Sequence, residues 1–407
     1  MQTTIKLAWK NIWRSRIRSL VVIASIIVGV WAVIFLMSFS LGMGDSYVKN
    51  AIKNQFSHLQ AHHPDFMDDQ LVKYTLPYDS SLIAQIPEVK NSTARLLANG
   101  MLSTGHGARG VTIKGILPGQ ENALSGIQEK IVEGQFISDA DLKGLLVSEK
   151  LTQKFKLKLK SRVVLTFQDD AGEIQSAAYR VTGIFNTGNA MVDQGQVLVN
   201  QAGLRTLLFA DSVPQDRYHE VAVELIRPDM VDSVQPKLSQ MMPGSLVQNY
   251  KELAPDLALM ETQIRTSGLI FIGIFMLALI FGIVNTMLMA VLERYKELGM
   301  LQAIGMPKNK VFNMVVLETL FLSIVGVPIG FFLGWLSVKA FQQNGFDLSA
   351  FAKGNEQFGM SSRIFPILDP TLFIQLGIAV AITAFLASIY PALKAIKLKP
   401  VEAIRKI

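Results

Sequence analysis

The sequence predicts an α-helical membrane protein with four transmembrane helices plus a large mixed α/β periplasmic domain inserted between helices 1 and 2. Three observations lead to this fold class: four long apolar runs, the wide interval between the first run and the second, and the short β-rich runs inside that interval. About 20 apolar residues span a hydrocarbon core of about 30 Å as a helix, and a helix pairs its backbone amides without water.

The four apolar runs place the predicted transmembrane helices at residues 19–44, 266–292, 311–338 and 370–393. Glu318 is the only acidic or basic residue in all four runs. The first run is too long for a signal-peptide core and is followed by no small-residue cleavage site, so we expect it to be retained as a helix.

Lysine and arginine gather beside the predicted helices in residues 1–18, 293–310 and 394–407, and they are sparse in residues 339–369. Basic residues next to a membrane mark its cytoplasmic side. We therefore expect a cytoplasmic amphipathic N-terminal helix, a cytoplasmic coupling helix with its loop, and a cytoplasmic tail. Residues 339–369 are then a periplasmic loop, and residues 45–265 form the periplasmic domain. The net charge of +7 follows from this topology and does not indicate nucleic-acid binding.

Apolar and basic residues occupy separate stripes of the helix predicted for residues 3–17. The apolar stripe consists of Ile5, Trp9, Ile12 and Trp13. Such a helix suits the headgroup layer of a membrane, and Arg16 interrupts its apolar face, so we expect a bend into the first span there. A simple helical extension of the first span is the alternative.

The interval between the first two spans reads as a mixed α/β domain. Five β-rich segments are predicted as strands, at residues 111–116, 163–167, 179–185, 196–199 and 221–225. Residues 169–172 (Asp-Asp-Ala-Gly) separate two of them and predict a hairpin turn. Because the chain has no cysteine, this domain has to be stabilised by its own core.

Helices are predicted between these strands. Asp79 is expected to cap a helix that runs to residue 86, and two further helices are expected at residues 144–155 and 229–241. From Leu253 the chain is expected to be helical without a break into the second span. A continuous helix would carry membrane motion into the outer domain.

Little in the sequence indicates catalysis, and we expect a chain with no catalytic residues, no metal and no cofactor of its own. Residues 100–106 have two glycines at the spacing of a phosphate-binding loop, but the Lys and the Ser/Thr of that motif are absent. His58 and His62 could share a helical face and hold a metal, whereas Pro64 and the alternating pattern favour a strand and turn. Glu318 could relay protons or could pair near the cytoplasmic end of its span.

Residues 293–308 follow the second span and predict a short amphipathic helix parallel to the membrane, ended near Gly305 and Pro307. The run ERYKELGMLQAIG (293–305) resembles the coupling segment of the FtsX-like, type VII permeases of ABC transporters. The runs AWKNIWR (8–14) and PVEAIR (400–405) are similar to other motifs of that family.

Within that family, the inserted domain resembles the LolC/LolE permeases of lipoprotein release. The similar segments are GIFNTG (183–188) with Asp193 and the VLV run at 197–199, and then residues 224–240 and 249–252. The hairpin at residues 169–176 is too short for a long hook that would dock a periplasmic chaperone. The resemblance therefore leaves open a LolC-like or a LolE-like role, and a homodimer or a heterodimer.

The resemblance implies a non-catalytic permease in the bacterial inner membrane, with both termini cytoplasmic. An ABC ATPase dimer would bind ATP and Mg²⁺, a second permease would complete the complex, and a triacylated lipoprotein would pass to a periplasmic carrier. The residues implied for ATPase coupling are Glu293, Arg294, Glu297, Leu298, Gly299, Leu301, Ala303 and Gly305. Those implied for the lipid anchor, on faces of the first and second spans, are Val33, Met37, Leu41, Ile270 and Ile274.

Two other functions are compatible with the sequence. The first is a mechanotransmission permease that serves tripartite efflux or regulates cell-wall hydrolases. The second is a membrane-anchored sensor without energy coupling, which would not need an amphipathic cytoplasmic helix of this pattern.

Overall fold

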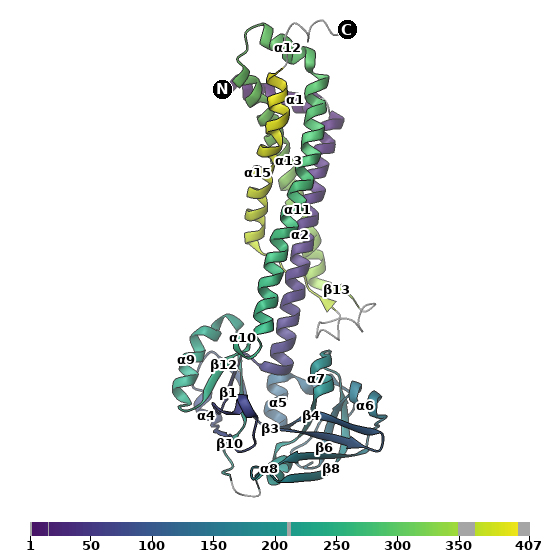
Figure 1. The fold of residues 1–407 in the computed structure, drawn as a ribbon, viewed down its shortest axis with the longest axis vertical. Coiled ribbons are helices and arrows are strands. Elements are labelled where there is room, and N and C mark those ends of the chain that lie inside the picture. The colour runs from purple at the N-terminus through teal and green to yellow at the C-terminus, as the bar shows by residue number, and fades with distance from the viewer. Residues whose placement is uncertain (1, 15, 210–212, 349–362, 398–407) are drawn as a thin grey trace. The chain divides into compact units, whose positions relative to one another are not determined.

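The structure is a computed structural model that describes residues 2–14, 16–209, 213–348 and 363–397 (Figure 1). The chain divides into two compact units. The helical unit comprises Met1–Gly44, Glu261–Phe346 and Ile364–Ile407, and the α/β unit comprises Asp45–Met260 and Asp347–Arg363. The PVEAIR run expected to close the chain (400–405) lies outside the described residues.

Within the part of the chain that the structure describes, six helices lie wholly or largely in the helical unit. They are α1 (Gln2–Arg14), α2 (Arg16–Ala51), α11 (Pro255–Glu293), α12 (Tyr295–Ala303), α13 (Lys308–Asn344) and α15 (Pro370–Ile396). Among the described residues, α2 together with its continuation to Phe56, α11, α13 and α15 are long and apolar enough to cross a membrane. The prediction of four apolar helices is confirmed, although all four helices extend beyond the runs predicted from composition.

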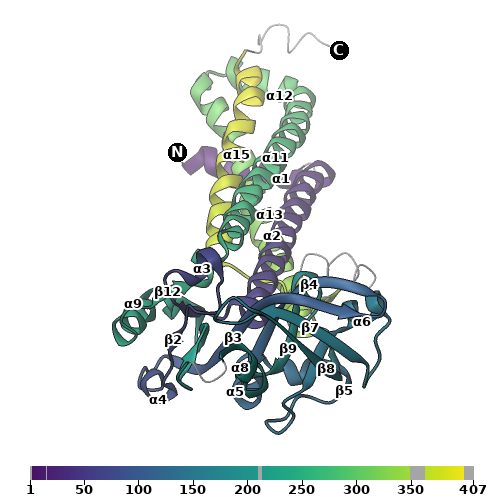
Figure 2. The same ribbon diagram turned by 60° about the horizontal axis from the view of Figure 1, so that its bottom comes forward.

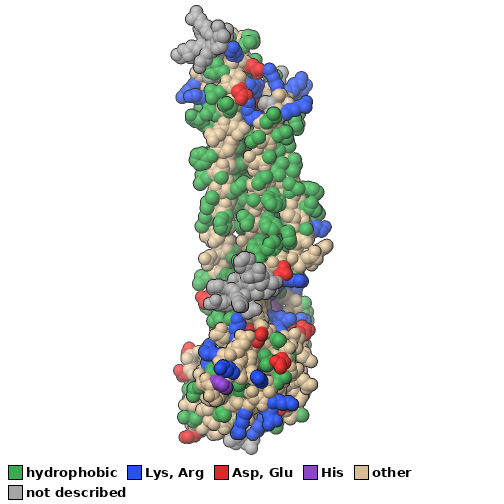
Figure 3. Space-filling model, turned by 90° about the vertical axis from the view of Figure 1, so that its right-hand side faces the viewer, with side chains coloured by type: hydrophobic (Ala, Val, Ile, Leu, Met, Phe, Trp, Pro, Cys, Tyr) green, Lys and Arg blue, Asp and Glu red, His purple; other side chains and the backbone are tan. Residues whose placement is uncertain are grey.

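Close packing of α2 on α13 follows from a row of glycines. Gly326, Gly330 and Gly334 of α13 face Ile26, Val30 and Ile34 of α2, and a Cβ added at Gly330 would lie 2.8 Å from Val30 Cβ. Small residues spaced by four let two helix backbones approach in lipid, where packing rather than hydrophobicity drives association. Apolar side chains cover the face of this unit seen in Figure 3, and charged ones gather at its α12 end.

Helix α1 lies across the end of the bundle beside α13 (Figure 1). Ala8 and Ile12 are buried against the apolar core, and Trp9 meets Phe321 edge-on at 5.6 Å. Trp9 and Trp13 remain exposed, as expected of anchors in a headgroup layer. The chain is described as two helices on either side of residue 15, next to the predicted bend at Arg16.

The α/β unit is built on a mixed sheet of ten strands. Nine follow the order β12-β1-β11-β3-β4-β9-β6-β8-β5, and β7 pairs with β3 and β8. The strands are β1 (Leu59–His62), β3 (Val89–Thr104), β4 (Gly107–Ile116), β5 (Ile131–Gly134), β6 (Gly144–Ser148), β7 (Arg162–Gln168), β8 (Ile174–Phe185), β9 (Gln196–Asn200), β11 (Glu220–Leu225) and β12 (Leu246–Asn249). A separate pair joins β2 (Leu76–Pro77) to β10 (Arg217–Tyr218).

Short helices surround this sheet (Figure 2). They are η1 (Ile52–Phe56, a π-helix), α3 (Phe66–Asp69), α4 (Ser80–Ile83), α5 (Pro118–Ser125), η2 (Ile127–Lys130), α6 (Glu149–Phe155), α7 (Ala190–Gly195), α8 (Gln201–Phe209), η3 (Pro228–Met230), α9 (Val231–Met241) and α10 (Tyr250–Leu253). Asp79 caps α4 as predicted, and the hairpin at residues 169–172 joins β7 to β8.

The helix predicted at residues 144–155 is wrong in its first half. Residues 144–148 form the buried strand β6, which runs parallel to β8 and antiparallel to β9, and the helix α6 begins only at Glu149. Leu145, Leu146 and Val147 are fully buried, and Ser148 caps α6 through its side chain. A short continuous apolar run reads alike as a buried strand or a helix, and burial on both faces favours the strand.

His58 and His62 form hydrogen bonds with the strands of the sheet. His58 Nδ1 accepts a hydrogen bond from Leu225 N, and His62 lies in β1 with its ring nitrogens 3.1 Å from His219 O and Gln60 Oε1. Within the described residues, no group of three His, Cys, Asp or Glu side chains could hold a metal ion. The strand-and-turn interpretation therefore describes this segment.

Buried charges tie α5 to the sheet. Arg95 on β3 binds Glu121 of α5 at 2.7 Å and Glu220 of β11 at 2.5 Å, and all three side chains are at least 93% buried. Burial alone would raise the pKa of each carboxyl, but Arg95 outweighs it, so both pKa values lie below the ordinary value. The folded state then binds fewer protons than the unfolded state. Its stabilisation is complete above the unfolded pKa of about 4.3 and is lost as the pH falls through the lower folded values.

We predict that Glu121→Gln destabilises the α/β unit by about 3–5 kcal/mol, because it leaves the Arg95 charge buried with one partner fewer. Calorimetry of the full chain in detergent should record a lower melting temperature at neutral pH. The matched control is Glu133→Gln at an exposed position, which should melt like the wild type. Equal melting of both variants would contradict the role given to this cluster.

Helix packing gives a second prediction. Gly330→Leu should lower the thermal stability of the helical unit by about 1–3 kcal/mol or more, because the new side chain meets Val30 of α2. Gly273→Leu on α11 is the control, since a Cβ there meets nothing within 4 Å. Scanning fluorimetry of both variants in detergent measures the difference, and a shift of the same size in both would disprove the packing argument.

Candidate functional site at the α12 end of the helical unit

Helix α12 is a short helix bounded by two turns. Arg294 breaks the helical path after α11, and Gly305 with φ +99° ends α12, where Met306 N donates to Leu301 O at 3.0 Å. Pro307 then caps the start of α13. Glycine adopts the positive φ that this helix end requires without steric cost. Helix α12 therefore ends near Gly305, as predicted from the sequence.

One face of α12 is buried in the bundle. Leu298 is 2% exposed, Gly299 is buried, and Leu301 packs on the same apolar cluster. These three residues were expected to contact an ATPase. Leu298 and Gly299 instead face the protein interior, so a substitution at Leu298 would disturb folding before it disturbed a partner.

Two ion pairs and one hydrogen bond join this segment to other helices. Arg14 of α1 binds Glu297 at 2.6 Å, and Arg18 of α2 pairs with Glu293 at the end of α11. Gln302 Nε2 donates to Ala395 O of α15 at 3.1 Å. Together with the buried face, these contacts join α12 to helices from both ends of the chain.

Glu318 of α13 lies beside this segment and is 7% exposed. Its Oε1 accepts hydrogen bonds from Arg294 Nη1 at 3.0 Å and from Asn11 Nδ2 of α1 at 2.5 Å. These contacts match the pairing alternative for Glu318, because both donors approach it from the α12 end of the bundle. Asn11 was missed by the sequence analysis; its only signal is a polar residue between the apolar positions Ala8 and Ile12.

The opposite face of α12 is open. Lys296, Met300, Ala303 and Ile304 are exposed, with Met300 at 54% and Ile304 at 78%. Of the predicted coupling residues, Glu293, Ala303 and Gly305 are also exposed, whereas Arg294 and Glu297 are partly buried in ion pairs. Met300 and Ile304 were not among the predicted coupling residues, although their spacing of four residues on a charged segment places them on one helix face.

The residues expected to hold a lipid anchor do not form one surface. Val33 and Met37 of α2 are buried in the helical core, where Met37 packs close to Gly268 of α11. Ile270 and Ile274 are 58% and 59% exposed on the outer face of α11, and Leu41 is half-buried. On a helix that is apolar all round, composition does not tell the packed face from the open one.

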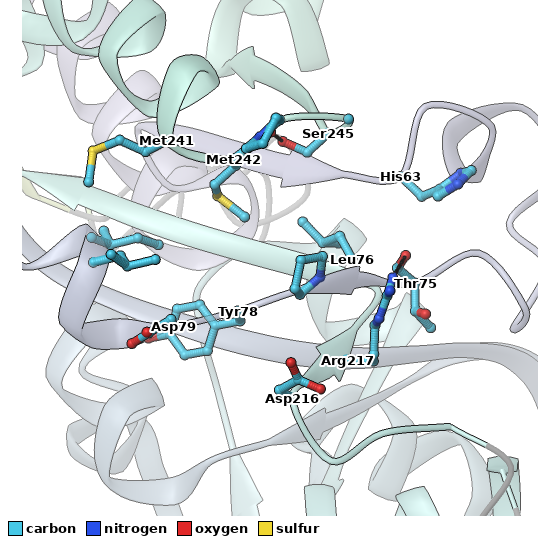
Figure 4. A pocket seen from close by; sticks show the side chains of 15 residues that line it. His63, Thr75, Leu76, Tyr78, Asp79, Asp216, Arg217, Met241, Met242 and Ser245 are labelled. Atoms are coloured by element: carbon cyan, nitrogen blue, oxygen red, sulfur yellow. Dashed lines mark hydrogen bonds between the residues drawn. The ribbon is translucent and has the colours of Figure 1, made fainter.

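The α/β unit contains a cavity of about 400 Å³ between the β2–β10 pair and the end of α9 (Figure 4). Met241 and Met242 lie on one wall, across from Leu76 and Arg217. Ser245 Oγ donates to Met242 O at 2.7 Å, and the Asp79 carboxylate caps α4. The lining therefore offers a mixed apolar and polar binding surface and no paired nucleophile and base. None of the predicted site residues lines it.

Comparison with known proteins places these features in a family. The FtsX-like permease C-terminal model matches residues 269–400, and the MacB-like periplasmic core domain model matches residues 19–241, more than half of the chain.

Individual relatives are distant. The pyoverdine export ATP-binding/permease protein PvdT of Pseudomonas fluorescens is 22% identical over 85% of this chain and 54% of the relative. The macrolide export ATP-binding/permease protein MacB of Rhodopirellula baltica is 25% identical over 48% of this chain and 27% of the relative. The periplasmic region of MacB from Actinobacillus actinomycetemcomitans covers 52% of this chain and 97% of that structure, at 11% identity and a TM-score of 0.35.

The chain spans about half of the length of the first of these relatives. The two family models together cover the first apolar helix, most of the α/β unit and the other three apolar helices. This chain therefore belongs to the ABC transporter permeases of the MacB and FtsX type.

Proposed function

We propose that this chain is the membrane subunit that couples ATP hydrolysis by a separate ATPase to the release of lipoproteins from the inner membrane. The observation that carries the coupling step is the two-sided character of α12. Its open face presents Met300 and Ile304, while its buried face and its ion pairs bind it to α1, α13 and α15.

The open face of α12 suits a protein partner. The Met300 side chain is flexible and the Ile304 side chain is rigid, and both can be buried in an apolar groove of a partner protein. Lys296 beside them can form ion pairs with acidic residues at the rim of that groove. A movement of the ATPase would pull on α12 through its open face, and the Arg14–Glu297 and Arg294–Glu318 pairs would pass that pull to α1 and α13. In this arrangement the cytoplasmic side lies at α12 and both termini are cytoplasmic.

A lipid-anchored substrate explains why energy is needed. Each buried CH₂ of an acyl chain contributes about 0.8 kcal/mol, so three chains do not leave a bilayer without work. The resemblance of residues 183–188 to lipoprotein-release permeases supports this substrate class. Within that segment Thr187 is tied to α7, since Asp193 Oδ1 accepts hydrogen bonds from Thr187 N at 3.1 Å and from Thr187 Oγ1 at 2.7 Å. Two permeases, identical or related, would enclose the acyl chains between their first spans.

Export of a small molecule is the second candidate. It is favoured by the relatives, whose names give pyoverdine or macrolides as their cargo and describe ATP-binding/permease proteins. Regulation of cell-wall hydrolases has no comparable support. A sensor without energy coupling is disfavoured by membership of a permease family.

We predict that depletion of this chain in its host leaves triacylated lipoproteins in the inner membrane. Pulse-labelling with fractionation of the two membranes measures their retention. Normal lipoprotein release together with sensitivity to macrolides or loss of siderophore secretion would overturn lipoprotein release and favour small-molecule export. Restoring the wild-type chain is the control for indirect effects.

A further prediction concerns the open face of α12. Met300→Asp with Ile304→Asp should reduce copurification of the ATPase at least tenfold, because two apolar contacts are replaced by charges that would be desolvated. Met67→Asp, at an exposed apolar position in the α/β unit, is the matched control. Both variants should melt like the wild type. Full ATPase binding by the α12 variant would refute this docking surface.

A further inference from the structure

Lys130 lies where the long helix from the membrane ends inside the α/β unit. Helix α2 passes into the π-helix η1, which stops at Ser57, whose N–H donates to Ile52 O at 2.7 Å. Lys130 is the last residue of η2 and approaches η1 from the side of α5 and β5. Its side chain is partly buried between these elements.

The Lys130 side chain joins two elements that are far apart in the sequence. Its Nζ donates to Asn54 Oδ1 of η1 and to Ser125 O at the end of α5, the latter at 3.1 Å. Asn54 Nδ2 in turn donates to Asn50 Oδ1 in the last turn of α2. One amine therefore connects the end of α2–η1 with the C-terminal end of α5.

Helix α5 is also held from the opposite side. Glu121 binds Arg95 of β3 in the buried charge cluster, and Asn91 Nδ2 of β3 donates to Ala123 O at 2.9 Å. The α5 helix is thus fixed to the sheet by one set of contacts and to η1 by another. A displacement of α2–η1 would reach β3 through the Lys130 contact and this short helix.

The main chain of Lys130 makes a further connection. Its carbonyl accepts a hydrogen bond from Asn186 N at 3.0 Å, within the segment 183–188 that resembles lipoprotein-release permeases. The same residue therefore borders η1, α5 and this segment.

The surroundings of the amine make its charge sensitive to pH. Burial and then Lys53 of η1 lower the pKa of Lys130 to about 8, against the raising effects of Glu121 on α5, Asp193 on α7 and Glu129 on η2. A charged amine binds amide and carbonyl oxygens about twice as strongly as a neutral donor. The contact is thus strong below pH 8 and weak above it.

We propose that Lys130 is a positioning residue that holds the end of α2–η1 against α5, and that loss of its proton releases this hold. A role of this contact in transport rests on the proposed function, because the contact affects transport only if the ATPase moves α2. The hold itself is a property of the α/β unit and exists without nucleotide or substrate.

The absence of cysteine from the chain makes a direct test possible. Spin labels at Lys49→Cys on the last turns of α2 and Ala123→Cys on α5 report the separation of the two elements, and both positions are exposed. The full chain in lipid nanodiscs is measured by pulsed electron resonance between about pH 6 and pH 10. We expect a narrow distance distribution at low pH that broadens with a midpoint near pH 8.

Three variants and one control separate a positioning role from a structural one. Lys130→Met should give the broad distribution at every pH, and Lys130→Arg should give the narrow one at every pH, because arginine stays charged. Lys53→Met should move the midpoint to higher pH, because it removes the largest repelling charge. Lys158→Met, at an exposed lysine, should match the wild type.

A narrow, pH-independent distribution in the wild type, or a wild-type distribution in Lys130→Met, would overturn the proposal. A uniformly broad Lys130→Arg would do the same. The measurement needs no ATPase and no lipoprotein, so it is separate from the depletion experiment. If the distance measurement confirms the Lys130 contact and depletion leaves lipoprotein release normal, the proposed function is wrong and this inference still stands.

Discussion

A carboxylate that is buried in an apolar helix bundle requires an ion-pair or hydrogen-bond partner, and at Glu318 this requirement determines which helices lie together. An unpaired charge in such a place costs several kcal/mol, and removing one partner of a buried pair costs about 3–5 kcal/mol. Glu318 meets the requirement with Arg294 and Asn11, which come from the segment before α12 and from α1. The need to neutralise one side chain thus fixes three elements to one another at the end of the bundle.

In the α/β unit, too, buried charges of opposite sign join elements from different parts of the chain. Arg95, Glu121 and Glu220 come from β3, α5 and β11, and none of them has enough exposed surface to keep its charge in water. Apolar packing would accept α5 in several orientations, whereas a two-sided carboxylate–guanidinium contact accepts few. In both units the buried charges decide which elements meet, and the apolar residues supply most of the free energy of association.

Much of this arrangement was readable from the sequence, and the failures have physical causes. Composition alone revealed the four apolar helices, and short runs rich in β-branched and aromatic residues located β4, β7, β8, β9 and β11. Residues 144–148 were misread because a strand buried on both faces loses the alternation that identifies strands. The open face of α12 was missed for another reason. Periodicity showed that the segment has two faces, but two of the helices that contact it come from distant parts of the chain: α1 through Arg14–Glu297 and α15 through Gln302–Ala395.

The joint at Lys130 follows from how force passes between a stiff helix and a sheet. A helix transmits motion along its axis, but at its end the backbone hydrogen bonds run out and the next link has to be made by side chains. At the end of α2 the chain forms a π-helix, in which Ile52 is buried in an apolar cluster and Asn54 accepts a hydrogen bond from Lys130. An apolar contact in place of the Lys130 hydrogen bonds would resist a displacement of η1 equally at every pH. A charged amine on two oxygen acceptors resists it strongly in one geometry, and only while the amine keeps its proton. A contact of this kind is firm while the amine is charged and weaker when it is neutral, and the proposed movement of α2 by an ATPase would require both states.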